Sequence, residues 1–499
     1  MKKYSIKSSV ISFIIKKRIN EIYKSSHQPL LYQKNILKNL VSKAVNTCFG
    51  YEHNFYKIND YSIFKNNIPI RNYEQIYPYI EKTIKGEKNI LWPGKVKWFA
   101  KSSGTTNDKS KYIPVTSDSL YNSYIKGGKD MLSLYENNFP NNDIYNGKGL
   151  MLGGSFSQKN HVITGDISAI LLSQFPYWVN YHRLPKKETA LMKNWEKKIK
   201  LIVEETVNEN ITNITGVPSW ISLILKNILK KTGKKNIKQV WPNLELYIHG
   251  GVNFLPYKNV FQELIGEEIN YMEGYNASEG FFAIQDQFKS SELLLMLNYG
   301  IFYEFILLKE YQKGSKKTIW LKDVAIKKEY VMIITTNAGL WRYMIGDVII
   351  FTSLNPYRIK IQGRTKNSIN VFGEELMINN TDKALTKTCD KLNCKINEYT
   401  VAPIFINKES GGHEWVIEFK KEPNNLKEFI KELDYNLKKL NSDYEAKRTH
   451  DLIIKEPKIT IVRNNQFYKW LKKKNKLGGQ NKMPRLSETR KIVEEILRI

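Results

Sequence analysis

The chain has 499 residues, and its 78 lysines and arginines outnumber its 49 aspartates and glutamates, giving a formal net charge of +29. Hydrophobic residues make up 41% and aromatic residues 12% of the chain, which excludes a disordered or fibrous protein and predicts two to four domains. No apolar run approaches the roughly 18–20 residues of a membrane span, and the N-terminal segment lacks the features of a secretory signal. We therefore expect a cytoplasmic protein without integral membrane association.

The positive charge permits two interpretations. A strongly basic chain can bind nucleic acid or an anionic surface. Its lysines, however, are spread along the sequence, for example over 193–200 and 234–238, and are not gathered in one arm or helix. We therefore predict a lysine-rich surface and no nucleic-acid partner.

The three cysteines are Cys48, Cys389 and Cys394, and no two of them form a CxxC pair. This sparse set argues against a disulfide framework and against a structural zinc site. We expect ordinary reduced thiols.

The first part of the chain alternates between two patterns. Apolar residues at helical spacing predict amphipathic helices at 31–47, 119–135, 191–207 and 219–229, the last with Ser219 as its N-cap. Short apolar runs predict strands at 150–152, 244–249, 269–272, 293–297, 301–308 and 330–335. This order predicts a mixed α/β sheet, followed by an antiparallel region from 293 to 351.

A new alternation begins after the run that ends at Arg364. Helices are predicted at 381–391, 425–440 and 488–497, and strands at 400–405, 414–419 and 459–462. Gly363 offers a place for the backbone to turn. We therefore predict a large N-terminal domain at 1–363 and a small α+β domain at 364–499.

The segment 101–114 reads Lys-Ser-Ser-Gly-Thr-Thr-Asn-Asp-Lys-Ser-Lys-Tyr-Ile-Pro. Its hydroxyl groups and backbone N–H groups can converge on a polyphosphate without steric bulk, and Lys109 and Lys111 add positive charge. On composition alone, an ordinary polar turn is the alternative.

Two further segments combine glycines with a carboxylate. Glu279 lies in a glycine-flanked stretch, 274–280, after the predicted strand 269–272, where it could hold Mg²⁺ against a phosphate. Upstream, the glycine pair after His249 allows a flat ring to lie against the backbone.

Asp347 interrupts an otherwise apolar strand, and a carboxylate in that position needs a partner. It either binds a ribose or forms a structural salt bridge with Arg342 or Arg364. Near the C-terminus, a glycine pair at 478–479 precedes Lys482, which is either a functional cation or a solvated surface charge.

Together these segments resemble the ANL superfamily of adenylate-forming enzymes. Within it they are similar to the auxin-responsive (Gretchen Hagen) family of acyl-acid amido synthetases, especially its bacterial-type members. The resemblance extends from about Leu31 to Ile499. It rests on the order and spacing of the stretches 102–106, 215–220, 274–279, 342–347, 363–364, 370–375, 411–415, 440–448 and 477–485.

The resemblance implies an α/β fold with a large adenylate-forming domain and a small mobile C-terminal domain. It implies an ATP- and Mg²⁺-dependent ligase that adenylates a small carboxylic acid, releases pyrophosphate, and transfers the acyl group to an amine of an amino acid. A monomer or weak oligomer is expected. An acyl-CoA-type ligase with a thiol acceptor and a degenerate basic binding protein are the alternatives.

The resemblance also assigns roles to individual residues. The phosphates would be cradled by Ser102, Ser103, Gly104, Thr105 and Thr106, and the adenine would be bordered by Gly251, Val252 and Tyr275. Asp347 would bind the ribose, with Arg364 beside it. The catalytic residues would be Ser278 at the α-phosphate, Glu279 at Mg²⁺, and Lys482, which would move in from the small domain.

Overall fold

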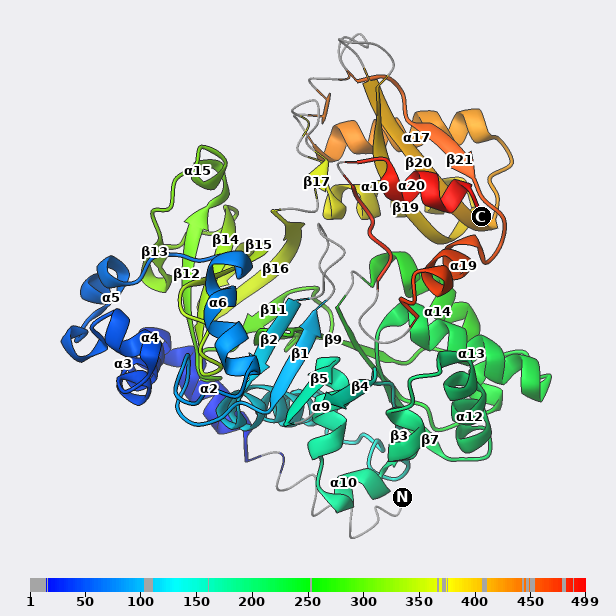
Figure 1. The fold of residues 1–499 in the computed structure, drawn as a ribbon. Helices are drawn as coiled ribbons and strands as arrows, with labels where there is room; N and C mark the ends of the chain where they lie inside the picture. Colours follow the sequence, from blue (N-terminus) through cyan, green and yellow to red (C-terminus); the bar gives the residue numbers. More distant parts are fainter. Residues whose placement is uncertain are drawn as a thin grey trace. The chain divides into compact units, whose positions relative to one another are not determined.

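The computed structural model describes residues 15, 17–102, 111–159, 161–251, 254–365, 368–369, 374, 376–405, 411–441, 444–445, 448, 454–477, 482–487 and 489–499. These residues form two compact units (Figure 1). The larger unit contains the described residues up to 251 and from 260 to 361, and the smaller one contains 254–259 and the residues from 362 onward. The mixed α/β fold class predicted from the sequence is confirmed.

Helices dominate the described residues between 17 and 84. They are α2 (Ile19–His27), α3 (Pro29–Ala44), α4 (Cys48–Glu52), α5 (Tyr61–Asn67) and α6 (Tyr73–Ile84), with a 3₁₀ turn η1 at Phe55–Lys57. The prediction of a helix at 31–47 is confirmed by α3, which begins at a proline because the first helical position needs no N–H donor. Helix α6 begins with a capping box between Asn72 and Gln75.

One sheet of twelve strands runs through the larger unit, in the order β13-β12-β14-β15-β16-β11-β10-β9-β8-β7-β3-β6. In chain order its strands are β3 (Lys148–Met151), β6 (Arg183–Leu184), β7 (Ile211–Thr215), β8 (Leu246–Gly250), β9 (Asn270–Ala277), β10 (Gly280–Ile284), β11 (Leu293–Leu295), β12 (Ile301–Leu307), β13 (Ile319–Trp320), β14 (Glu329–Thr336), β15 (Tyr343–Leu354) and β16 (Tyr357–Arg364). The pairs from β6 to β9 are parallel, and pairing becomes antiparallel at β9–β10. The predicted change from an α/β sheet to an antiparallel region is therefore confirmed.

Further helices alternate with these strands along the chain. They are the π-helix η2 (Leu120–Ile125), α8 (Lys126–Asn138), α9 (Ile167–Gln174), α12 (Trp195–Thr206), α13 (Pro218–Thr232) and α14 (Lys258–Ile265). The predicted helix at 119–135 is thus interrupted by a π-helical turn. The N-cap prediction for α13 is wrong: Val217 caps it and Pro218 is its first residue, because proline suits that position.

Smaller elements complete the larger unit. A second sheet has the order β2-β1-β5-β4, with strands β1 (Trp98–Ser102), β2 (Lys111–Val115), β4 (Phe156–Lys159) and β5 (Val162–Gly165). The short helices are α7 (Ser117–Ser119), α10 (Tyr177–Tyr181), α11 (Lys187–Ala190), α15 (Leu308–Gln312), and the 3₁₀ turns η3 (Ile237–Gln239) and η5 (Leu321–Asp323).

The smaller unit has its own core. Its sheet β19-β20-β21 consists of Lys395–Phe405, Gly411–Lys421 and Lys458–Ile461, and a two-stranded ribbon pairs β17 (Ser368–Ile369) with β18 (Leu376–Met377). Its helices are α16 (Ile378–Lys391), α17 (Leu426–Leu440), α19 (Gln466–Lys473), α20 (Lys491–Leu497) and the 3₁₀ turn η4 (Leu255–Tyr257). Trp415, Leu385 and Leu433 belong to one buried cluster. The α+β alternation was predicted, whereas α19 was not.

None of the helices in the described part of the chain combines the length and the apolar character required to cross a bilayer.

Candidate active site

A tight hairpin presents Ser278 and Glu279. Strand β9 continues through Ala277, which pairs with Gly280 of β10, so these two residues alone form the turn. The strand predicted at 269–272 thus extends through Ala277. Both side chains of the turn are 5% exposed, so the Glu279 carboxylate is held away from bulk solvent.

The π-helix η2 holds this turn in place through hydrogen bonds to its backbone. The Tyr124 hydroxyl donates hydrogen bonds to the carbonyl oxygens of Ala277 at 3.0 Å and Ser278 at 2.7 Å. The Phe281 N–H donates to Ser123 Oγ at 3.1 Å. Burial, and secondarily the charge of Glu279, raise the pKa of Tyr124 well above its ordinary value, so its hydroxyl remains a donor.

Sequence reasoning missed Tyr124, because a tyrosine within a helical pattern carries no local sign of such a contact. The π-helical turn that carries it is itself a feature often found at functional sites.

Asp347 and Tyr275 lie together although 72 positions separate them. The Tyr275 hydroxyl donates a short hydrogen bond to Asp347 Oδ2, and both residues are buried. Tyr275 comes from β9 and Asp347 from β15. The structure therefore brings together residues from two separate sequence segments that were both predicted to contact the nucleotide.

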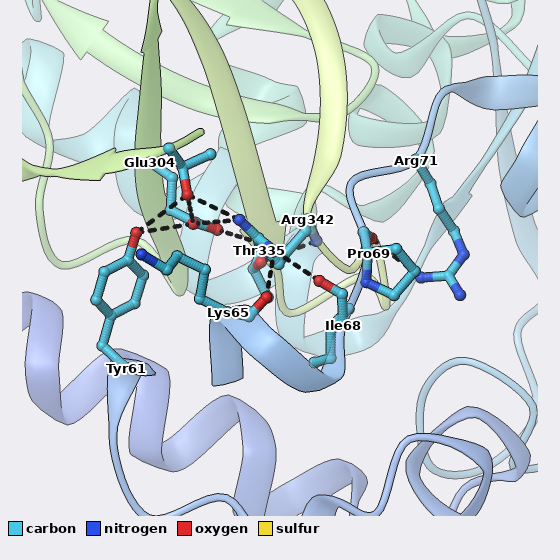
Figure 2. A network of polar contacts seen from close by, with 9 residues as sticks. Tyr61, Lys65, Ile68, Pro69, Arg71, Glu304, Thr335 and Arg342 are labelled. Atoms are coloured by element: carbon cyan, nitrogen blue, oxygen red, sulfur yellow. Dashed lines mark hydrogen bonds and ion pairs between the residues drawn. The ribbon is translucent and has the colours of Figure 1, made fainter. Parts of the chain in front are cut away.

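The salt-bridge alternative with Arg342 is wrong. Arg342 pairs with the Glu304 carboxylate instead, with Nε at 2.9 Å from Oε2 and Nη2 at 2.8 Å from Oε1 (Figure 2). The two side chains are 4% and 1% exposed. A bidentate, fully buried pair of this kind is among the strongest charge-assisted contacts in proteins.

Arg342 also holds the segment after α5 against the sheet. Its Nη1 donates to the carbonyl oxygens of Lys65 at 2.8 Å and Ile68 at 2.6 Å, and the Tyr61 hydroxyl donates to Glu304 at 3.0 Å (Figure 2). On the main chain, the Met344 N–H donates to the carbonyl of Arg71 at 2.8 Å. These contacts anchor the beginning of β15, a few residues before Asp347.

The remaining predicted site residues fall into two groups. Gly251, at φ +78°, follows the end of β8, Ser102 ends β1, Arg364 ends β16, and Lys482 is partly buried in the smaller unit. Lys111 lies on β2 with Nζ 5.4 Å from the centre of the Tyr73 ring. The others lie outside the described residues: Ser103, Gly104, Thr105, Thr106, Lys109 and Val252.

Two ionisable side chains, His249 and Glu273, lie on the strands β8 and β9, which precede predicted site residues. His249 on β8 lies opposite Glu273 on β9 in the parallel register, so both project from the same face of the sheet. Burial lowers the pKa of His249 to about 3 and raises the pKa of Glu273 to about 7. At neutral pH this face therefore carries an uncharged imidazole and a carboxyl group that is close to titrating.

Replacing Glu273 with glutamine is expected to change how stability depends on pH. The folded-state pKa of about 7 exceeds the reference value of 4.5, so the wild-type protein loses stability as pH rises from 4.5 through 7. Over that interval the loss amounts to about 3 kcal/mol. The free energy of unfolding, measured with urea at pH 5 and pH 8, should fall much less between the two pH values for Glu273→Gln than for the wild type. The exposed Glu268→Gln should behave like wild type, and an equal pH dependence in both variants would contradict the assignment.

Three regions of the chain match known family domains. Residues 18–269 match the GH3 family N-terminal domain, residues 294–364 the GH3 family central domain and residues 379–491 the GH3 family C-terminal domain.

Two curated relatives from plants match the chain. One is a probable indole-3-acetic acid-amido synthetase from Arabidopsis thaliana, 24% identical over 388 residues, which are 65% of this chain and 64% of that protein. Another is a jasmonoyl–L-amino acid synthetase from Nicotiana attenuata, 24% identical over 365 residues, 58% of this chain and 61% of the relative. The matched part of the chain thus spans less than two thirds of each of these relatives.

Solved structures extend the likeness to the whole fold. The GH3.15 acyl acid amido synthetase superimposes with a TM-score of 0.80 at 16% identity, covering 97% of this chain and 96% of that one. A 2-hydroxyisobutyryl-CoA ligase superimposes with a TM-score of 0.56 at 11% identity, covering 97% and 92%. The fold is that of adenylate-forming ligases. Because its N-terminal, central and C-terminal regions match the three GH3 domains in order, the chain belongs to the GH3 family.

Proposed function

We propose that the protein is an ATP-dependent acyl-acid amido synthetase, which activates a carboxylic acid as its adenylate and transfers the acyl group to an amino acid. The observation that carries this proposal is the buried contact between Tyr275 and Asp347, beside the buried hairpin turn of Ser278 and Glu279. A ring and a carboxylate for a nucleoside, next to a hydroxyl and a carboxylate for its phosphates, are the groups that adenylation requires.

In the proposed reaction, a substrate carboxylate oxygen attacks the α-phosphorus of ATP, and the bond to pyrophosphate breaks. The product is a mixed anhydride, so AMP leaves readily when an amine attacks the acyl carbonyl. Catalysis then consists of positioning and charge stabilisation, without a covalent enzyme intermediate. Asp347 would orient the ribose, Ser278 the α-phosphate, and Lys482 of the smaller unit would stabilise negative charge during the first step.

Mg²⁺ fits this donor set. Within the described ranges no group of three or more His, Cys, Asp or Glu residues could hold a metal ion by itself. Mg²⁺ is commonly bound through one or two carboxylates together with substrate phosphates, so the single buried carboxylate of Glu279 suits it. When bound there, the ion would neutralise phosphate charge.

The proposed substrates follow the relatives. One relative is named an indole-3-acetic acid-amido synthetase and another a jasmonoyl–L-amino acid synthetase. A third is named a ligase of 4-substituted benzoates and glutamate. For this chain we propose a small carboxylic acid and an amino acid as the two substrates, with ATP and Mg²⁺.

The test is a screen of carboxylic acids with ATP and Mg²⁺ that measures acid-dependent pyrophosphate release. Each acid that causes pyrophosphate release is then incubated with the enzyme, ATP and either an amino acid or coenzyme A. The product is identified by mass spectrometry. An amide supports the proposal. A thioester without any amide would replace it with an acyl-CoA-type ligase, and no pyrophosphate release with any acid would favour a binding protein without catalysis.

Asp347→Ala is expected to raise the KM for ATP by about 10- to 100-fold, because hydrogen bonds to a charged group contribute about 1.5–3 kcal/mol. The Asp347→Asn variant retains a side chain that can accept from Tyr275, so its fold should be preserved while the charge is lost. Initial rates of pyrophosphate release over a range of ATP concentrations measure the effect. The exposed Asp323→Ala serves as control, and an unchanged KM in both Asp347 variants would remove this residue from the nucleotide site.

A further inference from the structure

The last turn of α16 ends in a tight reversal that involves two cysteines. Asn393 has a left-handed backbone at φ +49°, a conformation that asparagine tolerates. The Cys394 N–H donates to the carbonyl oxygen of Cys389 at 3.1 Å, and the Leu392 N–H donates to that of Thr388 at 3.0 Å. A bond from the sixth residue to the first across a left-handed residue is the Schellman motif of helix C-termini.

This motif places the side chains of its first and sixth residues in contact, usually as an apolar pair. Here those residues are Cys389 and Cys394. Standard bond lengths added to the 3.1 Å hydrogen bond limit the distance between the two α-carbons to about 7 Å, and the angle at the carbonyl shortens it. A disulfide bridges α-carbons about 4.4–6.8 Å apart, so the backbone is compatible with a bond between them.

The two thiols differ in environment. Cys394 is 3% exposed and lies in the apolar core of the smaller unit, whereas Cys389 is partly exposed at its edge. A hydrogen bond from Cys389 lowers the pKa of the Cys394 thiol, and the same contact raises the pKa of Cys389. The pair thus joins one partly exposed sulfur to one buried sulfur through a hydrogen bond.

We propose that Cys389 and Cys394 are a redox modification site, which forms a reversible intramolecular disulfide when the protein meets a hydroperoxide. One sulfur of the pair, as its thiolate, takes one peroxide oxygen and becomes a sulfenic acid, with release of water. The other sulfur then attacks it and displaces a second water, so two thiols and one hydrogen peroxide give one disulfide and two waters. A dithiol reductant reverses the change.

The third cysteine provides a control within the same chain. Cys48 begins α4 and donates a hydrogen bond to Glu52 at 3.2 Å, and its pKa is raised by burial and by that contact. No second cysteine lies near it in sequence, since the next is Cys389. Oxidation should therefore spare Cys48 while it joins the other two.

The test uses the full-length, fully reduced protein, exposed to hydrogen peroxide, then quenched in acid and alkylated under denaturing conditions. Reduced protein takes up three alkyl groups, one for each cysteine. After peroxide we expect one alkyl group, located on Cys48, a peptide carrying a disulfide between Cys389 and Cys394, and recovery of all three sites with dithiothreitol. Mapping the wild-type chain requires no variant to fold.

Variants sharpen the result. Cys48→Ser should still form the disulfide, whereas Cys389→Ser and Cys394→Ser should each lose it. Three alkylated cysteines after peroxide, or oxidation of Cys389 to sulfinic acid without a disulfide, would overturn the proposal. A bond between Cys48 and either of the other two would overturn it as well.

Discussion

Lys482→Ala is expected to lower acid-dependent pyrophosphate formation by about 100- to 1,000-fold, because a group that stabilises developing transition-state charge contributes on this scale. The expectation rests on the proposed function and on the position of Lys482 in the segment that resembles the C-terminal motif of the family. The lysine would act in the first step only. When chemically prepared acyl-adenylate is supplied, amide formation should therefore remain within a few-fold of wild type.

The control is Lys473→Ala, which removes an exposed lysine at the end of α19 in the same unit. Lys482→Arg retains the charge and should recover part of the lost rate. If Lys473→Ala impaired pyrophosphate formation as much as Lys482→Ala, the assignment would fail, because a general loss of positive charge would explain both. Equal losses in both steps for Lys482→Ala would point to a structural role.

Arg342→Met is expected to destabilise the protein by about 3–5 kcal/mol, because removal of one partner from a buried ion pair leaves an uncompensated charge. The stranded carboxylate is that of Glu304, whose side chain is 1% exposed. The carbonyl oxygens of Lys65 and Ile68 also lose the donor that they share (Figure 2). Urea unfolding at pH 7 measures the change.

Two comparisons identify the cause of this loss. Arg342→Met combined with Glu304→Met should cost less than the sum of the two single changes, because the double variant leaves no unpaired charge. Lys85→Met breaks an exposed pair with Glu81 and should cost no more than about 0.5 kcal/mol. A loss for Arg342→Met as small as that for Lys85→Met would show that the network of Figure 2 contributes little.

Local sequence patterns were sufficient where burial follows directly from residue type. The helix predicted at 31–47 forms because its apolar periodicity marks the face that packs, and the strand predicted at 301–308 forms because its nearly continuous apolar run is buried on both faces. The start of α13 was misplaced by the emphasis on Ser219, since Pro218 satisfies the first helical position by itself.

The sequence by itself determined the fold class and the motif segments that identify the family. Each of these depends on residue type and on short spacing along the chain. Only the tertiary structure decided which carboxylate faces which partner. Asp347 meets Tyr275 rather than Arg342, and Arg342 meets Glu304, because the folded chain brings together residues that are distant in sequence and lie on or beside strands that are not neighbours in the sheet. The contact between Tyr124 and the turn of Ser278 has the same cause. The two residues are distant in the sequence, and no local pattern indicates that they meet.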